Sequence, residues 1–162
     1  MNKAGLFAFL AVLSLLALIL PAGIYAEPAH EINKAAFSNL TGKKWMLAEL
    51  RTGEQTILID RTKPELDNLD GIYSLEFNES QVSGMGAPNR YFAPYTEGEG
   101  KALFIGNIAS TMMFPFIEPE GLRETQFFNY LSKVTRWDLV NGKLELFCSD
   151  DIGTPVVLVF VF

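Results

Sequence analysis

The sequence is poor in the side chains on which metal sites and disulfides depend. It holds one cysteine and one histidine among 162 residues. A single cysteine excludes an internal disulfide and a cysteine-rich zinc module, and a single histidine excludes motifs such as H-E-x-x-H that need two. Basic residues are also scarce, 13 against 19 acidic ones, which gives a formal net charge of −6. This balance argues against binding to nucleic acid or to an anionic membrane surface. We expect neither a metal nor another cofactor.

Residues 1–26 differ in composition from the rest of the chain. Lys3 provides a short positive start, and residues 6–20 are apolar except for one serine. Pro21 interrupts this run, and Ala26 is a small residue of the kind found before a cleavage site. We therefore predict a secretory signal peptide that is cleaved after Ala26, which places the protein in the periplasm or outside the cell. The alternative is an uncleaved N-terminal anchor, although a spanning helix needs ~20 apolar residues.

The remainder divides into a polar leader, residues 27–37, and a single domain, residues 38–162. His30 lies in the leader, away from every motif, so we expect a solvated side chain there. Alternating apolar and polar residues dominate the domain and predict strands. The predicted strands cover residues 44–50, 56–59, 72–77, 81–85, 101–105, 134–140, 144–148 and 156–162.

These strands are joined mostly by short turns, of which Asn141-Gly142 is the strongest hairpin signal, so neighbouring strands should pair antiparallel. Residues 119–132 predict the principal helix. We expect an α+β fold, a single domain in which a mostly antiparallel sheet packs against one principal helix. Trp45 and Trp137 occupy inward positions of their strands and should lie in the core. Cys148 continues an apolar strand face and should be a buried thiol.

No group of residues predicts catalysis. Carboxylates that are close in sequence, such as Asp150 and Asp151, fall in turns, where acidic residues are ordinarily solvated. None has the spacing of a calcium loop. The pair Gly84-x-Gly86 lacks the third glycine of a dinucleotide fingerprint. We therefore expect a protein that is not an enzyme.

Residues 84–100 are rich in glycine, proline and aromatics, and we predict a long loop. Two interpretations stay open at this point. The loop could pack over the end of the sheet, with the hydroxyls of Tyr91 and Tyr95 bonded internally. It could instead be a recognition loop in which Arg90 and the tyrosines meet a ligand.

The ordered motifs of the chain resemble the META domain family, which includes the heat-shock protein HslJ. The matching pieces are Leu40-Thr41-Gly42-x-x-Trp45, Gly84-x-Gly86-x-x-Asn89-Arg90-Tyr91, residues 108–113, Phe127-Phe128-x-x-Leu131 and Leu144-x-Leu146. The resemblance covers residues 38–162 and implies a compact α+β domain with an antiparallel sheet. Family members are typically associated with the bacterial envelope and are linked to heat shock, antibiotic resistance and secretion. The resemblance supplies no defined biochemical activity.

The chain departs from the family at two positions. The family often has a pair of cysteines where this chain has Pro88 and Pro115, so a redox role does not carry over. The resemblance still implies that residues 84–95 and 108–117 lie side by side, because a disulfide needs Cα atoms within ~7 Å of each other. Their joint surface is our candidate contact patch, formed by Asn89, Arg90, Tyr91, Tyr95, Thr111, Met112, Met113 and Phe116. The alternative is that residues 112–117 are buried beneath the helix.

These observations favour an exported, non-enzymatic META-like domain of the bacterial cell envelope. We expect it to act through contacts with another envelope protein in stress tolerance or secretion. We expect a monomer that touches the membrane only through its signal peptide. One alternative is a protein that binds a small apolar ligand, because 13 phenylalanines could line a cup. Another is an inhibitor of a second exported protein.

Overall fold

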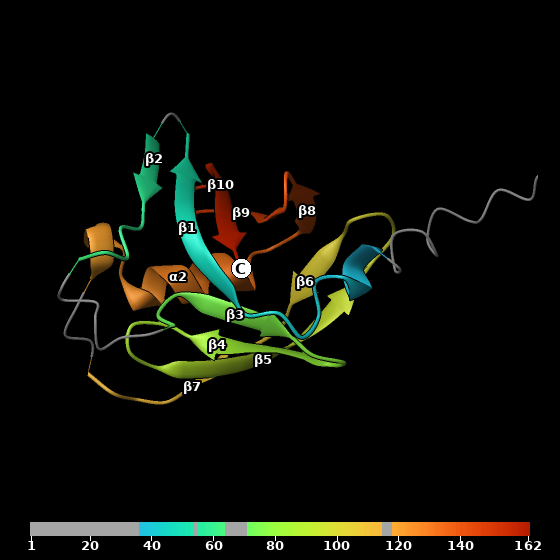
Figure 1. The fold of residues 1–162 in the computed structure, drawn as a ribbon, viewed down its shortest axis with the longest axis horizontal. Helices are drawn as coiled ribbons and strands as arrows, with labels where there is room; N and C mark the ends of the chain where they lie inside the picture. Colours follow the sequence, from blue (N-terminus) through green and yellow to red (C-terminus); the bar gives the residue numbers. More distant parts are fainter. Residues whose placement is uncertain (1–35, 54, 64–70, 115–117) are drawn as a thin grey trace, which may run out of the picture.

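A computed structural model describes residues 36–53, 55–63, 71–114 and 118–162. The predicted signal peptide, most of the predicted leader with His30, and residues 115–117 lie outside this part of the chain. The described strands are β1 (Trp45–Thr52), β2 (Gln55–Leu58), β3 (Ser74–Phe77), β4 (Gln81–Met85), β5 (Arg90–Glu97), β6 (Leu103–Ile105), β7 (Ala109–Ser110), β8 (Arg136–Val140), β9 (Lys143–Ser149) and β10 (Pro155–Val161). Figure 1 shows how they surround a common interior.

The sheet is antiparallel throughout its strand pairs, in the order β6-β5-β4-β3-β1-β10-β9-β8. Its two outer strands meet, because Ala102 bridges to Arg136 and the Trp137 amide donates to the Lys101 carbonyl oxygen over 3.0 Å. The sheet therefore curls into a nearly closed barrel, a shape that we did not predict. Closure removes two edges that would otherwise carry unpaired backbone groups.

A bulge in β1 helps the sheet to bend. The pairing of β1 with β10 shifts between Leu47 and Glu49, so one additional residue is accommodated there. Trp45, Leu47 and Leu50 all remain buried although a strict alternation would turn Leu50 outward. β10 is a central strand, because it pairs with β1 on one side and β9 on the other.

The principal helix, α2 (Glu124–Ser132), is shorter than the predicted helix over residues 119–132. Residues Pro119–Gly121 form a separate 3-10 turn, η2, in which Glu120 and Gly121 adopt φ values of 54° and 75°. These left-handed conformations end the turn, and the chain runs extended at Leu122 before α2 begins. The rest of the α+β prediction holds, because one main helix accompanies the antiparallel sheet.

Aromatic side chains close the interior of the barrel from two directions. Phe127 of α2 packs against Tyr73, which directly precedes β3, with ring centroids 4.9 Å apart. Phe37, from the short helical turn before β1, packs against Phe77 at the end of β3 and against Trp137. The predicted core positions of Trp45 and Trp137 are confirmed, since each is at most 2% exposed. Cys148 is partly rather than fully covered, and it packs at the margin of this core.

Candidate functional site

Residues 84–97 form two paired strands and a tight turn, which corrects the predicted long loop over residues 84–100. Strands β4 and β5 pair from Gln81 with Pro94 to Met85 with Arg90, and the turn holds residues 86–89. Gly84 permits this close packing, because a Cβ there would collide with the Ser74 carbonyl group. The Tyr91 hydroxyl donates to that same Ser74 carbonyl oxygen over 2.9 Å, so Tyr91 is an internal structural residue.

A buried carboxylate fixes the turn to the start of α2. Glu124 is 5% exposed, and its Oε1 accepts hydrogen bonds of 2.6 Å from the backbone amides of Ala87 and Asn89. Its Oε2 accepts a third bond of 2.6 Å from the Asn89 side-chain amide. Gly86 makes room for the carboxylate, because a Cβ there would lie 2.7 Å from both Cγ of Glu124 and the ring of Phe128. A buried charge with three donors is a satisfied structural group.

Asn89 extends this network to the segment after β7. Its Oδ1 accepts hydrogen bonds from the Thr111 hydroxyl over 2.8 Å and from the Met113 amide over 2.6 Å. Its Nδ2 donates to the Met113 carbonyl oxygen over 2.9 Å. Strand β7 also pairs with β5. The predicted proximity of residues 84–95 and 108–117 is thus confirmed for the described residues, while Pro115 and Phe116 lie outside them.

This attachment presents three apolar side chains to solvent. Met112 is 99% exposed, Met113 57% and Phe114 92%. The alternative that residues 112–117 fill space beneath the helix is therefore wrong for these three positions. We call residues 112–114 the presented segment. Its backbone is held by Asn89, while its side chains point away from the core.

The candidate contact patch is only partly assembled. Arg90 is exposed close to the presented segment, but Tyr91 is 3% exposed and lies beneath the sheet surface. Tyr95 packs against Phe37 and Phe77, and its hydroxyl donates to the Asn78 carbonyl oxygen. The alternation of β5 explains the correction, because it turns both tyrosines inward and Arg90 outward. Burial also raises the pKa of Tyr91, which keeps its hydroxyl a hydrogen-bond donor.

Two residues of the site, Glu124 and Phe92, were not among the predicted ones. Glu124 stands on the apolar face of α2, in phase with Phe127 and Phe128, and a carboxylate in that phase was the available signal for its burial. Phe92 is 54% exposed on the outer face of β5, next to Arg90. Its place in the alternation of β5 could have identified it.

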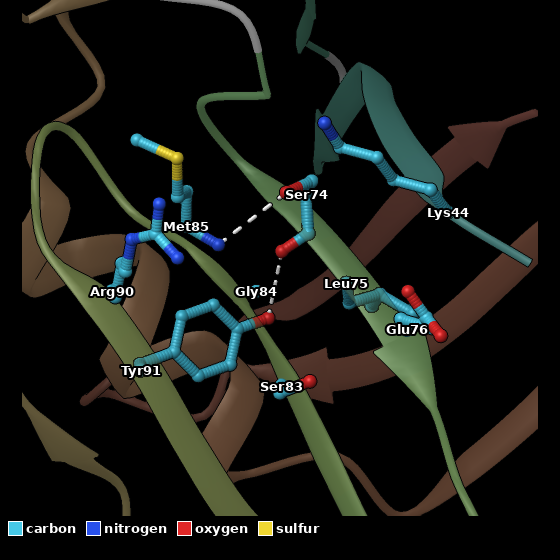
Figure 2. Close-up of a pocket in the computed structure, with 9 residues that line it drawn as sticks. All are labelled: Lys44, Ser74, Leu75, Glu76, Ser83, Gly84, Met85, Arg90 and Tyr91. Carbon is cyan, nitrogen blue, oxygen red and sulfur yellow. Dashed lines mark hydrogen bonds between the residues drawn. The ribbon is translucent and has the colours of Figure 1, made fainter. Parts of the chain in front are cut away.

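Two hollows flank Arg90 on the outside of the sheet. The larger, of about 360 Å³, is shown in Figure 2 and is lined by Lys44, Ser74, Leu75, Glu76, Ser83, Gly84, Met85, Arg90 and Tyr91. The smaller, of about 220 Å³, lies between β5 and β7 and is lined by Arg90, Tyr91, Phe92, Ala109, Ser110 and Thr111. Both are open to solvent. Within the described residues, no group of three His, Cys, Asp or Glu side chains could hold a metal ion.

The carboxylates singled out in the sequence have ordinary roles. Asp150 accepts hydrogen bonds from the amides of Ile152 and Thr154, which closes its turn. Asp151 forms an ion pair with Lys133. Both also line an open hollow of about 290 Å³ beside Tyr130, and their hydrogen bonds and ion pair stabilise the turn.

Comparison with known proteins agrees with this fold. The profile of the META domain family matches residues 38–158. An NMR structure of a protein from Burkholderia xenovorans is similar, with a TM-score of 0.55 and 21% sequence identity. The similarity covers 80% of this chain and 87% of that one, and at this identity it supports the fold alone. No curated protein sequence matches the chain. The chain belongs to the META domain family.

Proposed function

We propose that this META domain is exported and acts without catalysis, through contacts with another protein of the bacterial cell envelope, in stress tolerance or secretion. The observation that carries the proposal is the presented segment, residues 112–114, whose backbone is fixed by Asn89 while its apolar side chains face water. Export is supported by the signal-peptide pattern of residues 1–26.

The energetics of the presented segment favour a contact role. Exposed methionine and phenylalanine side chains gain no burial free energy in the isolated domain, whereas covering one typically stabilises by ~1.5–3 kcal/mol. Methionine and aromatic residues are also enriched at the centres of protein interfaces. Asn89 makes two hydrogen bonds to Met113, one to Thr111 just before the segment and one to the Glu124 carboxylate, so the backbone is already ordered before a partner arrives. Less conformational entropy is then lost on binding.

The filled interior weighs against the alternative of a cup for a small apolar ligand. Trp45, Tyr73, Phe77, Phe127 and Phe160 are all fully buried and occupy the space that such a ligand would need. Because the interior is filled, we place the contacts on the outer surface. Among the described residues, no helix is long and apolar enough to cross a bilayer.

Export is tested in the native cell. We expect fractionation to place the protein in the periplasm or medium, and mass spectrometry to find an N-terminus at Glu27. A protein that retains residues 1–26 in the membrane fraction would be anchored instead. A cytoplasmic protein would contradict the proposal.

The contact role is tested by site-specific crosslinking in intact cells. A photoreactive residue in place of Met112 should give one dominant adduct with an envelope protein, which is then identified and purified. The matched control is a photoreactive residue in place of Ile152, which is 89% exposed in the turn between β9 and β10. The purified partner should bind the unmodified domain and bind the Met112→Ser variant more weakly. Equal labelling from both positions, or turnover of a substrate by the purified domain, would contradict the proposed function.

A further inference from the structure

The two hollows beside Arg90 differ in character and together suggest what kind of chain could occupy them. We propose that they receive an extended segment of the partner protein in which an acidic side chain and an apolar side chain are spaced two or three residues apart. The acidic side chain lies in the larger hollow, between Lys44 and Arg90. The apolar side chain lies in the smaller one, against Phe92. The inference rests on the proposed function and specifies the chemistry of the partner.

The charges around the larger hollow carry the first step. Several basic side chains of the domain are in ion pairs, for example Arg51 with Glu145, and Lys101 with Asp138. Among the described residues, no carboxylate oxygen lies within 4.0 Å of the Lys44 ammonium or the Arg90 guanidinium. Two exposed cations, neither in an ion pair with any described residue, thus line one hollow of a chain with a net charge of −6. An anionic group would complement them.

The position of Glu76 decides where in the hollow an anion can lie. Figure 2 shows the Lys44 side chain reaching toward Ser74, with Arg90 beyond Met85 across β4, while the Glu76 carboxylate lies at the other end. An anion is therefore favoured on the Ser74 side, where both cations attract it. Close to Glu76 it would be repelled.

The smaller hollow carries the second step. Its lining includes the short side chains of Ala109 and Ser110 on β7 and the half-exposed ring of Phe92 on β5. Uncovered aromatic surface beside small residues fits an apolar side chain. The presented segment directly follows β7, so a chain in this hollow would also lie near Met112.

The spacing of the two hollows sets the spacing of the two side chains. One hollow lies over β4 and the other between β5 and β7, which are successive neighbours in the sheet. Strands lie ~4.8 Å apart, so one and a half to two strand spacings, roughly 7–10 Å, separate the hollows. An extended chain rises ~3.3 Å per residue, and two or three residues span that distance. A single small anion could occupy only the larger hollow.

The test uses a random twelve-residue peptide library displayed on phage. Selection on the wild-type domain should enrich peptides with Asp or Glu two or three residues from Leu, Ile, Met or Phe. The charge-reversal variant Lys44→Glu/Arg90→Glu should lose this enrichment. Both side chains are exposed and form no ion pair with the described residues, so the variant should retain wild-type stability in urea unfolding. The control is Lys133→Glu, on a lysine that lines neither hollow.

Affinities of the enriched peptides complete the experiment. A synthetic copy should bind at least about tenfold more weakly to the charge-reversal variant, because attraction becomes repulsion. It should bind the Lys133→Glu variant with the wild-type affinity, and Phe92→Ser should weaken binding as well. The inference is overturned if the library yields basic or uncharged peptides or no enrichment. It is also overturned if a peptide binds the charge-reversal variant and the Lys133→Glu variant with the same affinity.

Failure of this inference and failure of the proposed function are distinguishable. If a partner crosslinked at position 112 binds the charge-reversal variant as well as the wild type, the acidic segment is refuted and the contact role stands. If peptides of the expected kind are enriched but no partner is crosslinked in cells, the hollows stand as a binding site and the envelope role is refuted.

Discussion

The bond between Glu124 and Asn89 can be tested by exchanging its donor and acceptor. In the wild type the Asn89 side-chain amide donates to Oε2 of Glu124, while the Asn89 Oδ1 is committed to Thr111 and Met113. Asn89 therefore cannot rotate its amide to suit a changed partner. Glu124→Gln places a donor against a donor, and Asn89→Asp places a carboxylate against a carboxylate. The double variant again places a donor against an acceptor.

The expected magnitudes follow from burial. Glu124→Gln loses a hydrogen bond to a charged group, which costs about 1.5–3 kcal/mol. Asn89→Asp buries an uncompensated second carboxylate beside the first, which costs about 3–5 kcal/mol. The double variant should recover about 1–3 kcal/mol relative to the sum of the single effects. It should stay below wild type, because a carboxylate at position 89 cannot donate to the Met113 carbonyl oxygen as the amide of Asn89 does.

The measurement is the free energy of unfolding from urea titration, with the denaturant slope compared among all four proteins. Glu99→Gln serves as the control, because Glu99 is exposed, and its stability should lie within about 0.5 kcal/mol of wild type. If the two single effects simply add, within about 0.5 kcal/mol, then Glu124 and Asn89 do not act as a pair. That result would refute the network as the device that holds the presented segment.

Three further predictions concern stability and reactivity. Trp45→Ala should cost ~3–5 kcal/mol in urea unfolding, because the indole is fully buried, and a loss below about 1 kcal/mol would contradict its core role. Hydrogen bonds from Lys143 and Arg51 lower the pKa of Glu49 from its ordinary 4.5, so this group stabilises the fold above pH 4.5 and that contribution is lost as the pH falls through the lowered pKa. In thermal melts between pH 7 and 3, the melting temperature of Glu49→Gln should fall less steeply with decreasing pH than that of the wild type. Burial raises the pKa of Cys148 to about 12, so a thiol reagent at pH 8 should react slowly with the native protein and fast in urea. Rapid native labelling would contradict that burial.

The faces of the strands could be predicted from the sequence, and their closure could not. Period-two alternation correctly placed Trp45 and Trp137 inside, because each strand has one face on the core. The meeting of β6 with β8 depends on Ala102 and Arg136, which are far apart in sequence and carry no local pairing signal. The bulge near Ala48 also has no sequence signal, because no glycine marks the position where the alternation of β1 shifts.

The candidate site shows where local composition misleads. Glycine and proline between residues 84 and 100 suggested a loop, yet Tyr91, Ala93 and Tyr95 alternate with exposed neighbours as a strand requires. Here the glycines serve close packing against Ser74 and Glu124 rather than chain reversal alone. The larger hollow beside Arg90 could not be foreseen, because Lys44 reaches it only through the pairing of β1 with β3.

The hydrogen-bonded and the exposed residues of these motifs therefore have separate tasks. The Thr111 hydroxyl and the Met113 amide both donate to Asn89. The Glu124 carboxylate accepts from the backbone amides of the turn before β5. A fully satisfied network has little left to offer a partner, so its contribution to binding is to hold the backbone of the presented segment. Recognition must then come from side chains that the network leaves uncovered. Arg90 and Met112 are such side chains, since both are exposed beside the hydrogen-bonded residues of the same motifs.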